Sequence, residues 1–273
     1  MCLFLAHLRD PPAAPILLVA AHPDDEVIGA GAHLAFWPDV RVVHVTDGAP
    51  RNHPYGRDAI FPNRAAYAAA RRREAQDALA IAGIAAERIV DLAFVDQEAT
   101  FHLREISERI AALIAAIRPA VIVTHAYEGG HPDHDATCFA VHAARRIVAH
   151  SGVNPPDLVE MTAYFGRRRQ RITGAFLPSN RTPVIAVLDE ADRARKRRML
   201  LCHKSQIDLV DAFPVERECF RLAPNYDFRQ PPHFWRLFYE QHDFGLDGTQ
   251  WRERAAAALS SLGDAPSQGR TRA

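Results

Sequence analysis

The chain has 273 residues, of which 48% are hydrophobic and 24% charged, values typical of a soluble globular protein. Lysine and arginine together number 33, as do aspartate and glutamate, so the formal net charge is zero. This balance gives no indication of a nucleic-acid partner or of a membrane-surface protein. The length suffices for one large α/β domain with a substantial core, and no linker-like segment divides it.

The cysteines and the apolar segments indicate the cellular location of the protein. The four cysteines, Cys2, Cys138, Cys202 and Cys219, form neither a CxxC pair nor a spacing typical of disulfides. No apolar run approaches the roughly 18 residues that a membrane helix needs. The apolar opening, residues 1–6, is too short for a signal peptide and lacks a basic lead. We therefore expect reduced thiols, no integral membrane segment and a cytoplasmic location.

Strands and helices are expected to alternate along the first 150 residues. Apolar or β-branched runs predict strands over 16–21, 40–46, 88–94 and 121–124. Helical spacing of apolar residues, with proline or glycine stops, predicts helices over 26–37, 64–83, 106–117 and 135–150. This alternation indicates an α/β, Rossmann-like fold with a mostly parallel sheet flanked by helices.

In the second half of the chain, strands and helices are no longer expected to alternate regularly. Strands are expected over 158–165 and 182–188, and a charged helix over 190–206. We interpret them as extra C-terminal strands and helices on the same domain, which then spans residues 1–259. The small, polar segment 260–273 is expected to be a disordered tail. Residues 50–63, rich in proline, are expected to form a long loop, and loops of that length are often functional.

Two short motifs carry imidazole and carboxylate groups. The first, HPDDE at residues 22–26, directly follows the first predicted strand. The second, HPDHD at residues 131–135, lies in the loop after the fourth. In a doubly wound sheet of order 3-2-1-4, the first and fourth strands are neighbours, and ligands bind beyond their carboxyl ends. We therefore expect the two motifs to converge.

The residue types in these motifs suit a divalent metal. Neutral imidazole and carboxylate together bind zinc, and three protein ligands with an open position are typical of a catalytic site. The alternative is that the aspartates only cap helices and the histidines are solvated loop residues. This alternative is weaker for two motifs at paired strand ends than for one motif alone.

Three other functional classes stay open at this stage. Two histidines and one carboxylate also form the facial triad of mononuclear Fe(II) enzymes, although here the spacing is His-x-x-Asp rather than His-x-Asp. Gly29-Ala30-Gly31 suggests a nucleotide-binding oxidoreductase, but the full GxGxxG pattern is absent. A non-catalytic binding or scaffold protein could keep the fold, yet it would be expected to have lost Asp24 or a metal ligand.

The motifs together resemble a known family, the LmbE-like or PIG-L N-acetylglucosaminyl deacetylases. The resemblance covers roughly residues 15–150 and is weak thereafter. The matching segments are 21–26 and 131–134, with 46–48 (TDG), 71–74 (RxxE) and 129–130 (GG). It implies a metal-dependent amide hydrolase that deacetylates an N-acyl amino sugar or glycoconjugate and releases acetate and a free amine.

The resemblance also assigns roles to individual residues. It implies that the metal is held by His22, Asp25 and His134, with Zn²⁺ as the default and Fe²⁺ or Co²⁺ also compatible with these ligands. It makes Asp24 the general base, which can hydrogen-bond the activated water. It makes His131 the group that stabilises the oxyanion, oriented by Asp133.

Three further residues are candidates for substrate binding. Arg71 matches the family's substrate-binding arginine, although a solvated first-turn cation is an equal alternative. Tyr127 lies four residues before His131 and is a candidate for contact with the oxyanion, with aromatic packing as the alternative. Asp96 follows the third predicted strand, where the family often places an acid on sugar hydroxyls. The sequence leaves the oligomeric state open, a homo-oligomer included.

Overall fold

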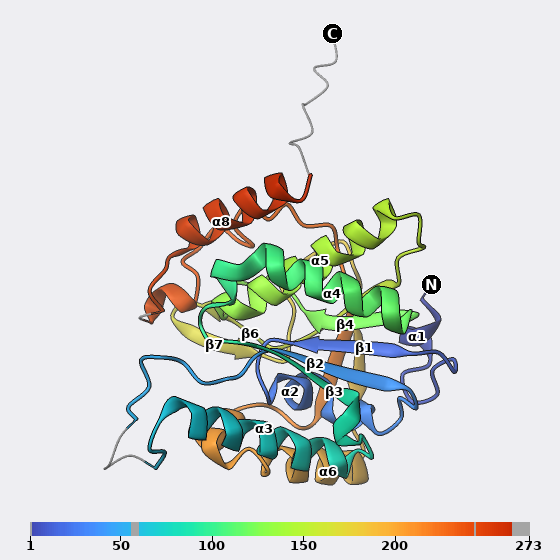
Figure 1. The fold of residues 1–273 in the computed structure, drawn as a ribbon. Coiled ribbons are helices and arrows are strands. Elements are labelled where there is room, and N and C mark those ends of the chain that lie inside the picture. Colours follow the sequence, from blue (N-terminus) through green and yellow to red (C-terminus); the bar gives the residue numbers. More distant parts are fainter. Residues whose placement is uncertain (1, 56–59, 243, 264–273) are drawn as a thin grey trace.

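A mostly parallel seven-stranded sheet forms the centre of the computed structural model, which describes residues 2–55, 60–242 and 244–263 (Figure 1). The strand order is β3-β2-β1-β4-β5-β9-β8, in which the first five strands run parallel to one another and β9 runs antiparallel to both of its neighbours, β5 and β8. The strands are β1 Ile16–Ala20, β2 Val40–Thr46, β3 Ile89–Phe94, β4 Val121–His125, β5 Asp157–Met161, β8 Val184–Val187 and β9 Arg217–Leu222. The predicted Rossmann-like α/β fold, including the order 3-2-1-4, is confirmed.

Helices cover both faces of this sheet. Figure 1 shows α2, α3 and α6 on one face and α4, α5 and α8 on the other. The long helices are α2 Asp25–Leu34, α3 Arg64–Ile81, α4 Leu103–Ile117, α5 Pro132–His150, α6 Glu190–Leu200 and α8 Gly248–Ser261. The short ones are α1 Leu3–Ala6, α7 Ile207–Val210, η1 Ala86–Arg88, η2 Ala99–His102, η3 Lys204–Gln206 and η4 Tyr239–Gln241. Within the described segments, no helix has both the length and the apolar character needed to cross a bilayer.

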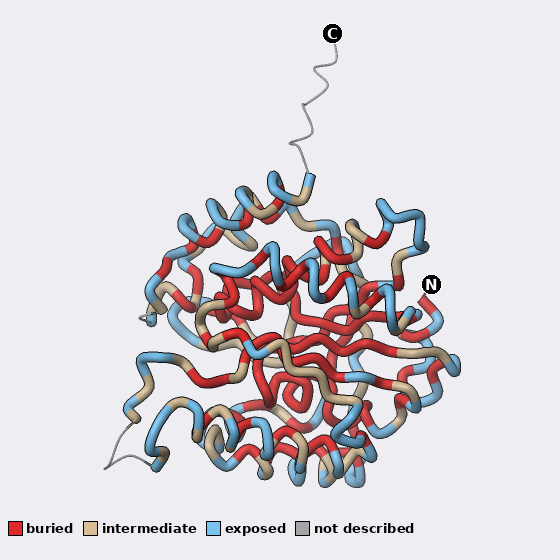
Figure 2. Tube along the Cα trace, in the orientation of Figure 1, coloured by how far each residue is buried: buried red, intermediate tan, exposed pale blue. Residues whose placement is uncertain are grey.

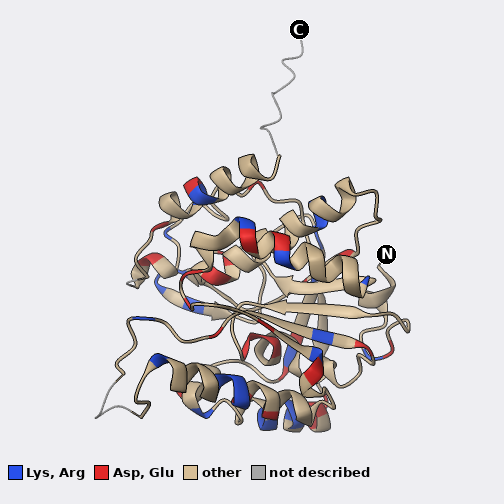
Figure 3. Cartoon of the chain, viewed as in Figure 1, with Lys and Arg blue, Asp and Glu red and all other residues tan. Residues whose placement is uncertain are grey.

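Charged residues are frequent on the outer helices, whereas the two central strands β1 and β4 have none. Figure 3 shows acidic and basic residues along α3, α4 and α6, with little charge on β1 and β4. In Figure 2 the sheet, α2 and α5 are largely buried. Along β1, Leu17 and Val19 pack into the cluster under α4 and α5, while Leu18 and Ala20 pack toward α2. The continuous apolar run of β1 is therefore explained by burial on both faces.

Several element boundaries differ from the sequence-based expectation. Helix α5 begins three residues early, at Pro132, because His131 caps it and proline is well suited to the first helical position. The expected strand 158–165 is broken into β5 and β6. The expected helix 190–206 ends at Leu200. Helix α8 continues through Ser261, two residues into the expected tail, and residues 264–273 lie outside the described part of the chain.

A small hairpin, β6 Tyr164–Arg167 and β7 Gln170–Thr173, lies against the loop that carries the second motif. The contact is closest at Gly130, where a Cβ atom would overlap the carbonyl oxygen of Tyr164. Only glycine allows the two backbones to approach this closely. The hairpin is thereby held at a fixed position beside the second motif.

We predict that Gly130→Ala will lower the free energy of unfolding by about 3 kcal/mol, because two backbones in contact must separate. The measurement is chemical denaturation. Gly152→Ala is the control: no atom lies within 4 Å of its Cβ position, and φ is +77°, so only about 1–2 kcal/mol of backbone strain is expected. Equal stabilities for the two variants would show that the hairpin is not held by this contact.

Candidate active site

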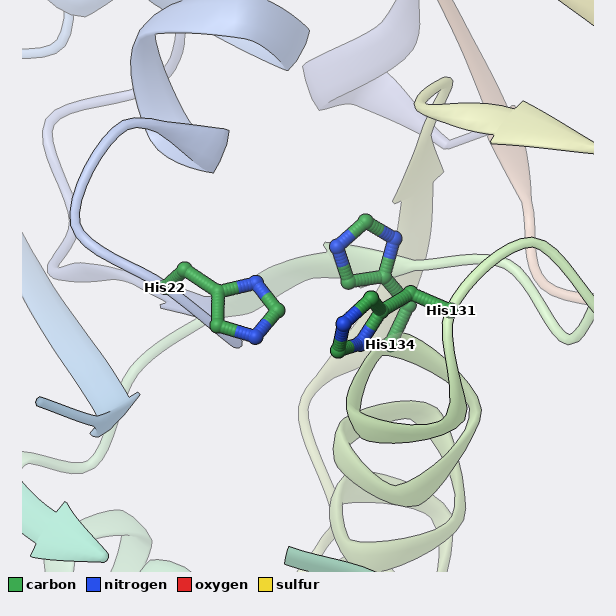
Figure 4. Close-up of side chains that lie close together, drawn as sticks. All are labelled: His22, His131 and His134. Atoms are coloured by element: carbon green, nitrogen blue, oxygen red, sulfur yellow. The ribbon is translucent and has the colours of Figure 1, made fainter. Parts of the chain in front are cut away.

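The two motifs meet at the carboxyl ends of adjacent strands. Strands β1 and β4 pair in parallel from Ile16↔Val121 to Val19↔Thr124, so the segments that follow them leave the sheet at the same end. Figure 4 shows the ring of His22 facing the rings of His131 and His134, which come from the start of α5. The ring centroid of His22 lies 4.6 Å from that of His131 and 5.2 Å from that of His134.

The carboxylate of Asp25, in the first turn of α2, contacts imidazoles from both motifs. Its Oδ2 lies 3.0 Å from Nδ1 of His22, and its Oδ1 lies 3.2 Å from Nε2 of His134. Burial alone would raise the pKa of Asp25, but the imidazoles of His134, His125 and His22 outweigh it and hold the pKa well below its usual range. Asp25 is therefore a buried carboxylate that stays ionised.

Ligand atoms gather in two overlapping groups at this site. Those of His22, His131 and His134 lie within 4.8 Å of one another, as do those of Asp25, His125 and His134. Nδ1 of His134 is buried without a hydrogen-bond partner among the described residues, and Nε2 of His22, which makes no hydrogen bond there, lies 3.1 Å from Oδ1 of Asp96. The donor set of two imidazoles and one carboxylate is that of a catalytic rather than a structural zinc site.

His125, at the end of β4, was not among the predicted ligands but also lies in this cluster. Its ring stacks on His134 with centroids 4.2 Å apart. Its Nε2 lies 3.5 Å from Asp25 and already accepts the N–H of Ala21 at 3.0 Å. Through that hydrogen bond His125 supports the first motif, while its Nδ1 is buried without a hydrogen-bond partner among the described residues.

A second buried group, Cys138, His142 and Glu160, also has ligand atoms close together. Both oxygens of Glu160 are occupied, one by Nε of Arg221 at 2.7 Å and the other by the hydroxyl of Tyr226 at 2.6 Å. A metal ion there would have to displace a guanidinium group. The group around Asp25 is therefore the better candidate metal centre.

Asp24 is held in a conformation that residues with a Cβ atom rarely adopt, with φ 148° and ψ −28°. Its amide donates to Oε2 of Glu26 at 3.1 Å, and its Oδ2 accepts from Nη2 of Arg71 at 2.8 Å. Burial raises the pKa of Asp24 to about 7, although Arg71 opposes the shift. A carboxylate with a pKa near neutrality suits the predicted role of general base.

Arg71, on α3, lies in the wall of the site, but its terminal nitrogens already have protein partners. Nη1 donates to the carbonyl of Gly48 at 2.7 Å, and Nη2 donates to the carbonyl of Pro23 at 3.0 Å as well as to Asp24. The structure thus gives Arg71 a role in positioning Asp24, and it is neither solvated nor in an exposed first turn. Binding of substrate by Arg71 stays a prediction.

His131 is arranged as a hydrogen-bond donor toward the site. Its Nδ1 accepts the N–H of Asp133 at 3.1 Å, so a neutral ring carries its proton on Nε2. Burial, followed by the charge of His22, lowers the pKa of His131 to about 3. The ring is therefore neutral at physiological pH, with Nε2–H available to an oxyanion.

Asp133 orients His131 by a different route from the one that its acidic side chain suggests. Its backbone amide makes the contact, whereas its carboxylate accepts the N–H groups of Gln97 at 2.6 Å and Ala99 at 3.1 Å. The carboxylate thereby ties the segment after β3 to the start of α5. This places Asp96 in the site, with its Oδ1 3.1 Å from Nε2 of His22.

The prediction that Tyr127 reaches the oxyanion is wrong. Its ring stacks on Trp251 of α8 with centroids 5.2 Å apart, and its hydroxyl donates to the carbonyl of Gln230 at 2.9 Å. The side chain therefore lies in the core under α8 and is absent from the described wall of the site. The tyrosines that line the cavity are Tyr67 and Tyr164, and the ring centroid of Tyr164 is 5.4 Å from that of His134.

The motifs open into a cavity of about 380 Å³, a volume suited to a small ligand. Sequence reasoning missed most of its outer wall. Most of the missed residues come from the proline-rich loop and from the part of the chain after residue 152, whereas Ile28, Tyr67 and Gln97 lie on α2, on α3 and after β3. They carry no periodicity that would single them out. The missed residues are Ile28, Pro50, His53, Tyr67, Gln97, Tyr164, Arg171, Gln206, Leu209, Phe213, Phe238, His242 and Phe244.

A buried chain of polar contacts, from Glu26 through His44 to Asp91, supports the strained Asp24. Nε2 of His44 lies 3.0 Å from Glu26, the residue that accepts the Asp24 amide, and its Nδ1 lies 3.3 Å from Asp91. Burial disfavours the charged ring, but Glu26 and Asp91 outweigh it and raise the pKa of His44 to about 9. A protonated His44 thus holds Glu26 in place.

Comparison with known proteins establishes the family. Residues 17–145 of this chain match the model of the PIG-L family, described as GlcNAc-PI de-N-acetylase. A 1D-myo-inositol 2-acetamido-2-deoxy-alpha-D-glucopyranoside deacetylase 2 of Catenulispora acidiphila is 31% identical over 90% of this chain and 95% of its own length. The chain therefore belongs to the PIG-L, or LmbE-like, family.

Other similarities are more partial. A probable N-acetyl-alpha-D-glucosaminyl L-malate deacetylase 2 of Bacillus cereus is 34% identical over 46% of this chain and 58% of its own length. Similar solved structures include the zinc-inhibited form of a teicoplanin deacetylase. Its TM-score is 0.57 and its sequence identity 19%, and the match covers 76% of this chain and 97% of that one. A 4-carboxy-2-hydroxymuconate hydratase of Pseudomonas putida has TM-score 0.52, 18% identity and coverage of 78% and 98%. At these identities the structural similarity concerns the fold alone.

We predict that His44 stabilises the fold in a pH-dependent manner. Because its pKa in the folded protein, about 9, exceeds the ordinary value of 6.5, the stabilisation is fully present below pH 6.5 and is lost as the pH rises through 9. His44→Gln should therefore cost on the order of 2 kcal/mol at pH 6 and much less near pH 10. Denaturation of both proteins across this range measures the difference, and a difference independent of pH would contradict a charged His44.

Proposed function

We propose that the protein is a metal-dependent amide hydrolase that removes the acetyl group from an N-acyl amino sugar or glycoconjugate. The carrying observation is the buried, ionised Asp25 between His22 and His134, with Asp24 beside it. Membership in the PIG-L family and its relatives' names support an N-acetylglucosamine-containing substrate. Zn²⁺ is the proposed metal, and the same donors also accommodate Fe²⁺ or Co²⁺.

The metal would be held by His22, Asp25 and His134. When bound, it would supply Lewis acidity that activates water and polarises the acyl carbonyl. The remaining chemistry falls to the protein's own side chains. Asp24, a buried carboxylate with a pKa of about 7, takes a proton from the attacking water and returns it to the departing amine. The amide C–N bond breaks, a C–O bond forms, and acetate and a free amine leave.

His131 acts on the carbonyl oxygen. Its neutral ring donates Nε2–H to the negative charge that develops as the tetrahedral intermediate forms. Because Asp133 fixes the other ring nitrogen through its amide, the donor is already oriented before the substrate binds. Asp96, which lines the cavity, would accept hydrogen bonds from sugar hydroxyls.

The rival classes fit the structure less well. An open, helix-flanked sheet is unlike the β-barrels that usually carry an Fe(II) facial triad. The glycines that suggested a nucleotide-binding loop lie inside α2, where a Cβ on Gly29 would overlap the sulfur of Met161. A non-catalytic scaffold would not need the strained, paired Asp24. The hydratase neighbour shows that the fold alone does not decide the reaction.

The proposed setting is the cytoplasm, with a small-molecule substrate and no nucleic-acid partner. All four cysteines are free, in agreement with a reducing compartment. The test of the function is a panel of N-acetylated sugars and simple amides, scored for free amine with metal analysis of the same sample. Amine release from N-acetyl sugars by metal-loaded protein supports the proposal, and no release from any of them contradicts it.

Asp24→Asn is predicted to retain the metal and to lose about 10²–10⁴-fold in kcat, because the amide cannot take the proton. Free-amine assays and elemental analysis of the same preparation measure both quantities. Asp10→Asn, which changes an exposed carboxylate remote from the site, is the matched control. A near wild-type kcat in Asp24→Asn would remove Asp24 from the role of base.

His134→Ala is predicted to lower the bound metal as well as the rate, because one of three ligands is lost. His150→Ala removes an exposed histidine from the other end of the same helix and should change neither quantity. Undiminished metal content in His134→Ala would refute its assignment as a ligand.

A further inference from the structure

Arg171 projects from the β6–β7 hairpin into the wall of the active-site cavity. The hairpin is rich in arginine, and Figure 3 shows basic residues along it. Only Arg171 of these arginines lines the cavity, where it is half-buried. Because Gly130 fixes the hairpin against the second motif, the position of Arg171 relative to His131 and His134 is also fixed.

Aromatic rings support the guanidinium group of Arg171. Its Cζ lies 5.2 Å from the ring centroid of Phe213 and 5.8 Å from that of Tyr164. The same Tyr164 ring lies 5.4 Å from the ring of His134, centroid to centroid. Tyr164 is therefore close both to the guanidinium and to a residue of the proposed metal centre. Cation–π contacts engage the face of a guanidinium and leave its N–H edge available to a ligand.

Among the described residues, no carboxylate forms an ion pair or hydrogen bond with Arg171. The acids of the cavity are all engaged at its inner end: Asp24 with Arg71, Asp25 with His22 and His134, and Asp96 with His22. The other arginine of the cavity wall, Arg71, is paired and buried. The cavity thus has a histidine and carboxylate cluster at one end and an unpaired cation at the other.

We propose that Arg171 binds an anionic group, a carboxylate or a phosphate, on the part of the substrate that extends away from the scissile amide. The proposal rests on the deacetylase function proposed above and specifies its substrate class as acidic N-acetyl glycoconjugates. The planar fork of an arginine recognises both anions through paired N–H donors. Phe213 beside it, and Leu209 and Phe238 elsewhere in the wall, make this part of the cavity partly apolar, and a charged contact is stronger in such surroundings than in bulk water.

Three N-acetylglucosamine probes that differ in the attached group test this selectivity. They are the neutral methyl glycoside, the L-malate glycoside, which carries carboxylates, and the 1-phosphate. The wild-type protein is expected to show at least 10-fold higher kcat/KM for one or both anionic probes than for the neutral probe. Whichever anionic probe is preferred identifies the anion. Equal kcat/KM for all three would overturn the proposal while leaving the deacetylase function intact.

The variant Arg171→Gln is expected to lower kcat/KM for the preferred anionic probe by about 10- to 100-fold, mostly through KM, because binding rather than chemistry is lost. Its effect on the neutral probe should be less than about 3-fold. Arg171→Lys, which keeps the charge but not the fork, should lie between the two. Arg167→Gln removes an exposed arginine from the same hairpin and should behave as wild type. An equal loss on neutral and anionic probes would contradict an anion site.

A binding measurement separates this proposal from the proposed function. Calorimetric titration with L-malate and with inorganic phosphate should give binding to the wild-type protein that is at least 10-fold weaker in Arg171→Gln, whether or not any probe is deacetylated. Thermal unfolding confirms that the variant is folded. Absence of amine release from every probe counts against the deacetylase, whereas indistinguishable anion binding by folded wild-type and variant proteins counts against the role of Arg171.

Discussion

The contact of one buried carboxylate with imidazoles from two distant segments determines the arrangement of the site. Asp25 begins α2, directly after β1, and reaches both His22 of its own loop and His134 of α5. A carboxylate that remains ionised without access to water requires positive charge or hydrogen-bond donors around it. Either protonated imidazoles or a divalent cation meets that requirement, and only the cation leaves the imidazoles neutral and able to act as ligands.

The surroundings of Asp25 place the other groups of the site. Asp24 lies between the end of β1 and the start of α2, and its backbone has a strained conformation with φ 148°. Arg71 from α3 and Glu26 with His44 from the β2 side hold it there. Strain of this kind persists only where neighbouring groups determine the backbone, and it is often found at functional sites. The residues behind Asp24 therefore contribute to the geometry of the proposed base without contacting a substrate.

The inner half of the site could be predicted from the sequence because its residues follow buried strands directly. The apolar run of β1 fixes where the chain leaves the sheet, and the strand order brings the β4 loop to the same edge. Tyr127 was misplaced because spacing along a loop does not reveal which way a side chain points, and here the ring packs under α8. Arg71 does line the cavity, but its pairing with Asp24 depends on the approach of α3, and binding of substrate by Arg71 stays a prediction.

The outer half of the site could not be predicted in the same way. Tyr164 and Arg171 belong to a hairpin whose position depends on one close backbone approach at Gly130, and such contacts leave no periodic signal. The expected single strand 158–165 conceals the break at which the chain leaves the sheet to form β6. The proposed substrate selectivity therefore depends on tertiary contacts in the later part of the chain, whereas the candidate metal centre depends on local motifs.

Diffraction from crystals of the zinc-loaded protein, with anomalous data at the zinc edge, tests the central claim most directly. The account predicts one strong peak between the side chains of His22, Asp25 and His134, with two nitrogen atoms and one oxygen atom at about 2.0–2.2 Å. A peak at the Cys138, His142 and Glu160 group instead, or no peak near Asp25, would contradict it.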